Sequence, residues 1–191
     1  MAAVVLTLIA TPAHGFEHTW HIGADGGWAV ASFPEGGVSG FGGGAHGTYG
    51  LDDRFSVRMQ GDVFAFGRPA DRTSTLAVHG AAGAEYTLDV ARWVIHGAAM
   101  LGPQYTLVPD WADGTPRDAF LQVAATVPVG LRYFITDHWT VGGEVQYRLL
   151  FLGPEDRPSQ ALFLLARVDG VFGWAPGSGV VPPDPPPVGP R

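Results

Sequence analysis

The chain of 191 residues contains no cysteine, lysine or asparagine, and only 15% of its residues are charged. The absence of cysteine excludes disulfides and thiolate chemistry. A soluble domain generally needs about a quarter to a third of charged residues on its surface, so this composition indicates a surface that is not covered by charge. All eleven basic residues are arginine, and the net charge of -7 argues against a nucleic-acid-binding surface.

Long hydrophobic runs are also missing. Beyond residue 15, no stretch approaches the roughly 18 apolar residues that a transmembrane helix needs. The first fifteen residues carry a largely apolar stretch from Ala2 to Ala10, followed by Pro12 and the triplet Ala13-His14-Gly15. This pattern is typical of a signal peptide, so we expect residues 1–15 to be cleaved near Gly15. A membrane location for the remainder requires a closed β-barrel, the other fold that satisfies every backbone group there.

The chain does contain a strict alternation of apolar and polar residues. From Trp139 to Phe151 every second residue is apolar or glycine, and the residues between them include Glu144, Gln146 and Arg148. A period of two with chemically different faces predicts a β-strand between two different media. The alternation recurs at residues 55–66 and 160–174.

Turn signals divide the chain into eight predicted strands, at about residues 18–32, 38–50, 55–66, 74–88, 93–108, 118–136, 139–153 and 160–174. Short polar turns alternate with longer connections rich in Pro, Asp and Arg. An even strand number, with short turns at one end and longer loops at the other, matches a bacterial outer-membrane barrel. The sequence therefore predicts an all-β fold, an eight-stranded antiparallel up-and-down transmembrane β-barrel.

The polar face of each strand is expected to point inward. Grouping the bulky apolar residues on one face leaves no Asp, Glu or Arg there. The interior of an eight-stranded barrel is just wide enough for side chains, and the polar face is diluted with glycine and alanine. An arginine on the lipid face would cost roughly 2 to 4 kcal/mol at the midplane. Aromatic residues gather near the short-turn end, as an interfacial girdle requires: Trp20, Tyr49, Phe55, Tyr86, Trp93, Tyr133, Trp139 and Trp174.

The predicted lumen contains a structural polar network of mixed sign. Its members are Asp25, Arg58, Asp62, Glu85, His96, Arg132, Glu144, Arg148, Arg167 and Asp169. Buried charges need partners, and counting residues across the short turns pairs Arg132 with Glu144 and Glu85 with His96. We interpret the network as a plug rather than a conducting path, because side chains fill a barrel of this size.

Three features together resemble the OmpA/OmpX-like outer-membrane β-barrel family over about residues 16–174. They are the eight-strand plan, the segment from Gly130 to Trp139 leading into Gly143 to Tyr147, and the closing strand from Arg167 to Trp174. The resemblance implies a bacterial outer-membrane location and contact with outer-membrane lipid and lipopolysaccharide. It also implies that the barrel-assembly machinery recognises the aromatic-ended last strand during insertion. Residues 175–191 are similar to the Pro-rich hinge of OmpA-type proteins and are expected to form a periplasmic tail.

Enzymatic and metal-binding functions have weak support in the sequence. A lipid A deacylase or acyltransferase needs a His near a Ser, and the nearest patterns are His46-Gly47-Thr48 and His138-Trp139-Thr140. His46, His79 and His96 lie on separate predicted strands and are expected to be hydrogen-bonded lumen residues. We therefore expect a non-catalytic monomer without metal or cofactor, with an envelope structural or surface-interaction role. A soluble lipocalin-like carrier of an apolar ligand and a lipid A modifying enzyme remain as alternatives.

Overall fold

The computed structural model describes residues 18–33, 36–67, 74–90, 92–109, 116–151 and 159–173. Each of the eight predicted strands is present and begins within about two residues of its predicted start. The bounds are β1 (Trp20–Phe33), β2 (Gly36–Gly50), β3 (Phe55–Gly67), β4 (Ser74–Val90), β5 (Trp93–Pro109), β6 (Pro116–Thr136), β7 (Trp139–Phe151) and β8 (Gln160–Phe172). The expected strand residues 152, 153 and 174, the signal segment 1–15 and the tail 175–191 lie outside the described residues.

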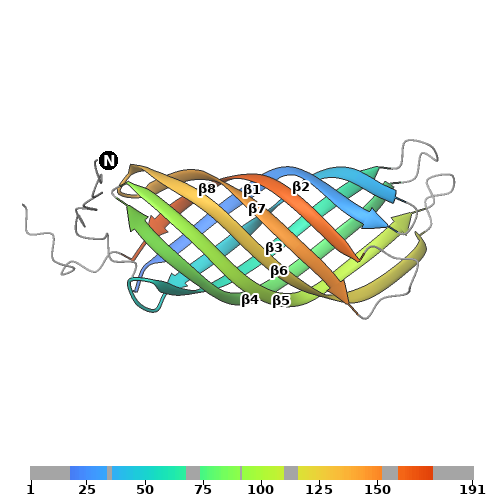
Figure 1. Ribbon diagram of the computed structural model, residues 1–191, viewed down its shortest axis with the longest axis horizontal. Helices are drawn as coiled ribbons and strands as arrows, with labels where there is room; N and C mark the ends of the chain where they lie inside the picture. Colours follow the sequence, from blue (N-terminus) through green and yellow to red (C-terminus); the bar gives the residue numbers. More distant parts are fainter. Residues whose placement is uncertain are drawn as a thin grey trace, which may run out of the picture.

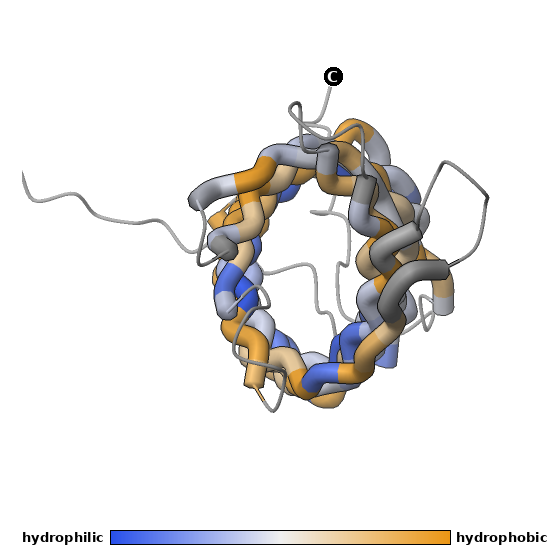
Figure 2. Tube along the Cα trace, turned by 90° about the vertical axis from the view of Figure 1, so that its right-hand side faces the viewer, coloured by the Kyte–Doolittle hydropathy of each residue, from blue (hydrophilic) through white to orange (hydrophobic). Residues whose placement is uncertain are grey.

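The eight strands form one closed barrel in sequence order, and every neighbouring pair is antiparallel. β1 closes the barrel by pairing with β8, from Trp20 opposite Phe172 to Ser32 opposite Gln160. The strands run obliquely along the long axis (Figure 1), and the trace closes into a ring when seen from the end (Figure 2). Closure leaves no unpaired sheet edge, so the predicted fold class is confirmed. None of the described residues forms a helix long and apolar enough to cross a membrane.

The two ends of the barrel differ in their connections. At the short-turn end, β2 leads to β3, β4 to β5, and β6 to β7 through residues 51–54, 91–92 and 137–138. At the opposite, long-loop end, the segments 68–73, 110–115 and 152–158 lie outside the described residues. In the β2–β3 turn, Asp52 Oδ1 accepts hydrogen bonds from the backbone amides of Arg54 and Phe55, both at 2.7 Å. This aspartate turn closes the hairpin locally.

Alternation places apolar side chains outside and polar side chains inside. On β3, Val57 and Met59 are 42% and 51% exposed, whereas Arg58 between them is fully buried. The same pattern follows β7 and β8. The predicted orientation is therefore confirmed, and the lipocalin-like alternative, which needs the apolar face inside, is excluded.

Aromatic residues near the short-turn end stack in cross-strand pairs on the outer surface. Trp20 packs on Tyr49 with ring centroids 4.9 Å apart, and they are register partners on β1 and β2. Phe55 with Tyr86 and Trp93 with Tyr133 repeat this arrangement at 5.2 and 4.8 Å. Such a band, apolar at the ring and polar at the hydroxyl or indole edge, suits a membrane interface. The expected eighth member, Trp174, lies outside the described residues.

Both cross-turn pairs predicted within the lumen are wrong. Glu144 lies opposite Gly130 and Arg132 opposite Gly142, two residues away from the predicted pairing. The tight turn that pairs Thr136 with Trp139 accounts for one residue, and an irregularity between Phe134 and Thr136 accounts for the other. Likewise, Glu85 lies opposite Ala98 rather than His96, because β4–β5 pairing continues to Val90 and Trp93. The β4–β5 turn is tighter than the sequence indicated, so each β4 residue pairs with a β5 residue two positions beyond the predicted partner.

Candidate functional site

The lumen collects all ten residues of the predicted polar network. Nine of them are at most 3% exposed, and the Asp25 side chain is 2% exposed. They come from β1, β3, β4, β5, β6, β7 and β8. Because successive side chains of a strand point to opposite faces, each of these residues shares its inward face with its neighbours two positions away.

The strands β3 and β7 face each other across the lumen and run in the same direction. Their inward side chains therefore meet in a ladder. Arg58 donates from Nη1 and Nη2 to the two carboxylate oxygens of Glu144, at 2.7 and 2.9 Å. One step further, Gln60 Nε2 donates to Gln146 Oε1 at 3.0 Å. In the third step, Arg148 Nη2 donates to Asp62 Oδ2 at 2.7 Å. The ladder bridges the full width of the barrel.

Glu144 joins more strands than the others. Besides Arg58 of β3, its Oε2 accepts from Arg167 Nη1 of β8 and lies 2.8 Å from His96 Nε2 of β5. Glu85 forms a neighbouring centre, since its carboxylate accepts from Arg132 Nη2 at 2.7 Å and from Arg58 Nη1 at 3.2 Å. The observed partners are thus Arg132 with Glu85 and His96 with Glu144, so the two predicted pairs have exchanged their carboxylates.

A third group of contacts surrounds Asp169. Arg167 donates from Nη2 and Nε to its two oxygens at 2.9 and 3.1 Å, and Thr140 Oγ1 donates to it at 2.9 Å. His46 lies between two carboxylates, with Nε2 on Asp169 and Nδ1 3.0 Å from Asp25 Oδ2. His46, Gln60, Gln146 and Thr140 therefore belong to the network although they were not among the ten predicted members. His46 was predicted to be a hydrogen-bonded lumen residue, and strand parity places Gln60, Gln146 and Thr140 on the same inward face.

Every carboxylate of the predicted network has a cationic or histidine partner. His79 Nδ1 lies 3.0 Å from Asp62, which also binds Arg148, and the remaining carboxylates contact the groups named above. Paired in this way, the four arginines and five carboxylates avoid most of the penalty for burying an isolated charge. The arrangement is suited to holding the walls of the barrel in place.

The two motifs considered for acyl transfer do not form a nucleophile and base pair. Thr48 Oγ1 has no hydrogen-bond partner among the described residues, while both ring nitrogens of His46 face carboxylates. Thr140 Oγ1 donates to Asp169, and His138 lies in the exposed β6–β7 turn. Within the described part of the chain, no group of three or more His, Asp or Glu side chains is arranged to hold a metal ion.

The long-loop half of the lumen contains a buried apolar cluster, which sequence analysis missed. Its buried cluster consists of Ala29, Ala31, Phe64, Phe66, Ala77, Ala161, Phe163 and Leu165. Phe64 and Phe163 meet edge to face with centroids 4.8 Å apart, and the Arg148 guanidinium lies 4.3 Å from the centre of the Phe163 ring. The signal was present in the sequence, since Phe64 and Phe66 share parity with Arg58, Gln60 and Asp62.

A closed antiparallel barrel with an apolar outer surface and a lumen lined largely by polar side chains defines a transmembrane barrel of the bacterial outer membrane. The chain belongs to the outer membrane protein beta-barrel domain family, whose model matches residues 1–165. This match confirms the predicted family and location. No curated protein sequence matches the chain.

Solved structures of other outer-membrane proteins share the fold. Neisserial surface protein A is 20% identical, with a TM-score of 0.67, over 82% of this chain and 100% of its own. Ail, the attachment invasion locus protein of Yersinia pestis, is 10% identical, with a TM-score of 0.57, over 82% of this chain and 99% of its own. The N-terminal barrel domain of Pseudomonas aeruginosa OprF is 13% identical, with a TM-score of 0.52, over 82% and 98%. At these identities the likeness concerns the fold alone.

Proposed function

We propose that this outer-membrane barrel is non-catalytic, has a structural or surface-interaction role in the cell envelope, and has a lumen plugged by its own side chains. The observation that carries the proposal is the ladder between β3 and β7. Arg58 with Glu144, Gln60 with Gln146, and Asp62 with Arg148 cross the lumen at three successive levels. Side chains that bind each other across the barrel occupy the space that a pore would need.

The outer surface supports a lipid-embedded monomer. Large apolar side chains such as Ile22, Leu101 and Leu164 are more than half exposed, and they lie on strands from both sides of the barrel. Such a surface is suited to outer-membrane lipid and lipopolysaccharide. The assembly machinery would recognise the end of β8 during insertion. In this proposal residues 1–15 are the signal peptide and residues 175–191 are a periplasmic tail.

Lipid A modification is the competing function. It needs a hydroxyl activated by a base near the outer leaflet. In the two motifs that suggested it, both of which the structure describes, no histidine contacts the threonine hydroxyl. His46 faces two carboxylates, and Thr140 donates to Asp169. Expression of the protein in a host with defined lipid A, followed by mass spectrometry, separates the two functions. A new lipid A species that depends on His46 or His138 would contradict the non-catalytic role.

Reconstitution into planar lipid bilayers tests the closed lumen. The full-length protein is first checked on SDS gels, where an unboiled sample should migrate differently from a boiled one if the barrel is closed and stable in detergent. The folded protein is then expected to insert without steady ionic current. A stable current from protein that passes the gel test would overturn the plugged-lumen proposal.

A further inference from the structure

The lumen changes chemical character at one depth. Along β3 from the short-turn end, the inward residues are Ser56, Arg58, Gln60 and Asp62, followed by Phe64 and Phe66. β8 shows the same change at its own level, where Asp169 and Arg167 give way to Leu165 and Phe163. The contact between the Phe64 and Phe163 rings places both transitions at the same depth. One half of the lumen is thus charged, and the other contains the apolar cluster together with the uncharged polar residues Gln104 and Thr106 of β5.

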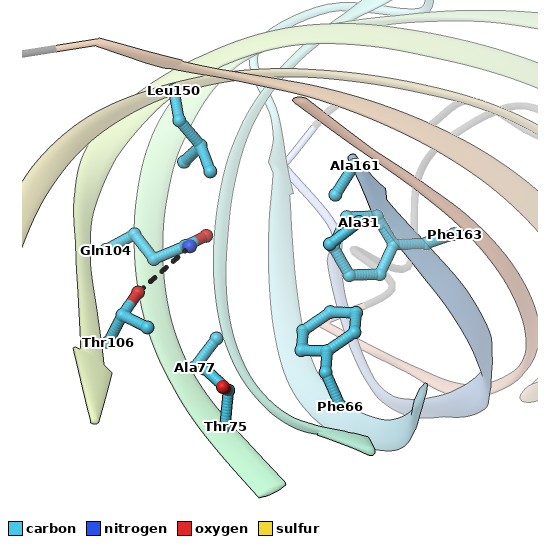
Figure 3. A pocket seen from close by; sticks show the side chains of 9 residues that line it. All are labelled: Ala31, Phe66, Thr75, Ala77, Gln104, Thr106, Leu150, Ala161 and Phe163. Carbon is cyan, nitrogen blue, oxygen red and sulfur yellow. Dashed lines mark hydrogen bonds between the residues drawn. The ribbon is translucent and has the colours of Figure 1, made fainter. Parts of the chain in front are cut away.

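The half that contains the apolar cluster is closely filled. Phe66 and Phe163 lie on one side, and Gln104, Thr106 and Leu150 lie on the other (Figure 3). The volume left between these walls is about 10 Å³. A single water molecule needs roughly 10 to 15 Å³ by the same measure, so a hydrated ion or an organic ligand does not fit.

Glycines on the neighbouring β2 make this packing possible. A Cβ atom on Gly42 would lie 2.7 Å from Phe64 Cγ, and one on Gly44 would lie 2.8 Å from the Asp62 Cβ. Both distances are below van der Waals contact. The phenylalanine layer therefore packs directly against the backbone of β2, without a gap at that wall.

The charged half contains polar atoms that no protein group satisfies. Arg132 Nε and Nη1, Arg58 Nε, His96 Nδ1 and both Asp89 oxygens are buried without a hydrogen-bond partner among the described residues. These atoms all lie on the short-turn side of the phenylalanine layer. Buried polar groups are almost always bonded to protein or water, so this half requires water.

The short-turn end of the lumen is lined by both polar and apolar side chains. An apolar cluster is present there too, but it comprises Val94, Phe134 and Val171 on β5, β6 and β8 only. The inward residues of the other strands at this level include Thr48, Thr87 and Thr140. The apolar cluster therefore occupies only part of the lumen at this end, and threonine hydroxyls line the rest.

We propose that the apolar layer of Phe64, Phe66, Phe163 and Leu165 is the seal of the barrel, and that the closely packed charged network beneath it admits water more readily than this layer does. The inference rests on the proposed closed lumen and goes beyond it by locating the barrier. Apolar constrictions exclude ions by dewetting, whereas charged side chains attract water and ions. Breaking ion pairs should therefore weaken the barrier less than shortening the aromatic side chains does.

Ionic current across planar bilayers tests this assignment with four proteins. They are the wild type, the double variant Phe64→Ala with Phe163→Ala, the double variant Arg58→Gln with Glu144→Gln, and the control Phe41→Ala. Phe41 lies on β2 with its side chain on the lipid face, 69% exposed, so the control makes the same chemical change outside the lumen. The phenylalanine double variant should conduct a steady current that the wild type lacks, since it removes the dewetting barrier. The Phe41 control should behave like the wild type, and the Arg58 and Glu144 variant should conduct much less than the phenylalanine variant.

The outcomes separate the two proposals. Current through the wild type overturns both the closed lumen and its seal. A silent wild type, with current through the Arg58 and Glu144 variant but none through the phenylalanine variant, overturns the seal alone. Each variant must first show the heat-dependent gel shift. If the double phenylalanine variant does not fold, the single variant Phe163→Ser replaces it. The serine hydroxyl makes the layer more polar, and only one aromatic ring is lost instead of two.

Discussion

Arg58 holds the carboxylate of Glu144 with both terminal guanidinium nitrogens, at 2.7 and 2.9 Å, from the opposite wall of the barrel. Backbone hydrogen bonds in a barrel connect only neighbouring strands, so this pair ties β3 to β7 in a way that the sheet itself does not. The planar fork of arginine matches the two carboxylate oxygens, which a lysine ammonium cannot do. Both side chains are almost fully buried, so each depends on the other for compensation of its charge.

Replacing one partner of this pair should destabilise the barrel strongly. Arg58→Gln or Glu144→Gln leaves the other charge buried and undercompensated, which costs about 3–5 kcal/mol. The double variant should lose less than the sum of the two single losses, by about 0.5–3 kcal/mol. Urea unfolding in detergent micelles measures all four free energies of unfolding. Strictly additive losses would show that the two side chains act independently.

Alanine at Gly42 should also destabilise the barrel. The new methyl group would lie 2.7 Å from the Phe64 backbone and ring, so the wall of β2 or β3 must move. Overpacking of this kind costs about 1–3 kcal/mol. Gly47→Ala is the matched control, because it lies on the same strand with nothing within 4 Å of the added Cβ. Equal unfolding free energies for the two variants would contradict the close approach of Phe64 to β2.

The sequence predicts strands well here because alternation is a local property. Glu144, Gln146 and Arg148 share a face whatever their surroundings, and only the lumen can accommodate them. The partners of these residues were not predictable in the same way. Arg132 and Glu144 are not partners, because the tight β6–β7 turn and an irregularity between Phe134 and Thr136 each shift the register by one residue. A bulge of one residue leaves almost no trace in a hydropathy pattern.

Contacts across the lumen were even harder to predict from the sequence. The meeting of Arg58 with Glu144 depends on the tilt and stagger of eight strands, which determine the residues that lie at the same depth. The inward orientation of Phe64 and Phe163 was available from parity. It was missed because apolar residues were grouped on the lipid face, and these two rings contradict that grouping.

An arginine on the outer surface should be costly only near the middle of the membrane. Leu101 is 64% exposed near the middle of β5, and Val90 is 44% exposed at the short-turn end of β4. Leu101→Arg should cost roughly 2–4 kcal/mol, and Val90→Arg about 0–1 kcal/mol, because the penalty falls towards the interface. Unfolding in lipid vesicles measures both values. Similar small losses at the two sites would mean that Leu101 does not face hydrocarbon.

Acid should loosen the β2–β3 turn through Asp52. Hydrogen bonds from the backbone amides of Arg54 and Phe55 stabilise its charged form and hold the pKa of this carboxyl below the usual aspartate value of about 3.9. A lowered pKa in the folded state means that the contribution to stability is present above the ordinary pKa. It is lost as the pH falls through the lower, folded value. Carboxyl chemical shifts in micelles should therefore give a titration midpoint below that of a model aspartate.

Asp52→Asn is the control for the same turn. The amide oxygen of asparagine accepts the same two backbone hydrogen bonds but does not titrate in this range. Acid-induced loss of amide protection at Arg54 and Phe55 should occur in the wild type and disappear in the variant. If the variant loses protection over the same pH range, another group governs the turn. A midpoint at or above the model value would show that the amides of Arg54 and Phe55 do not favour the charged carboxylate.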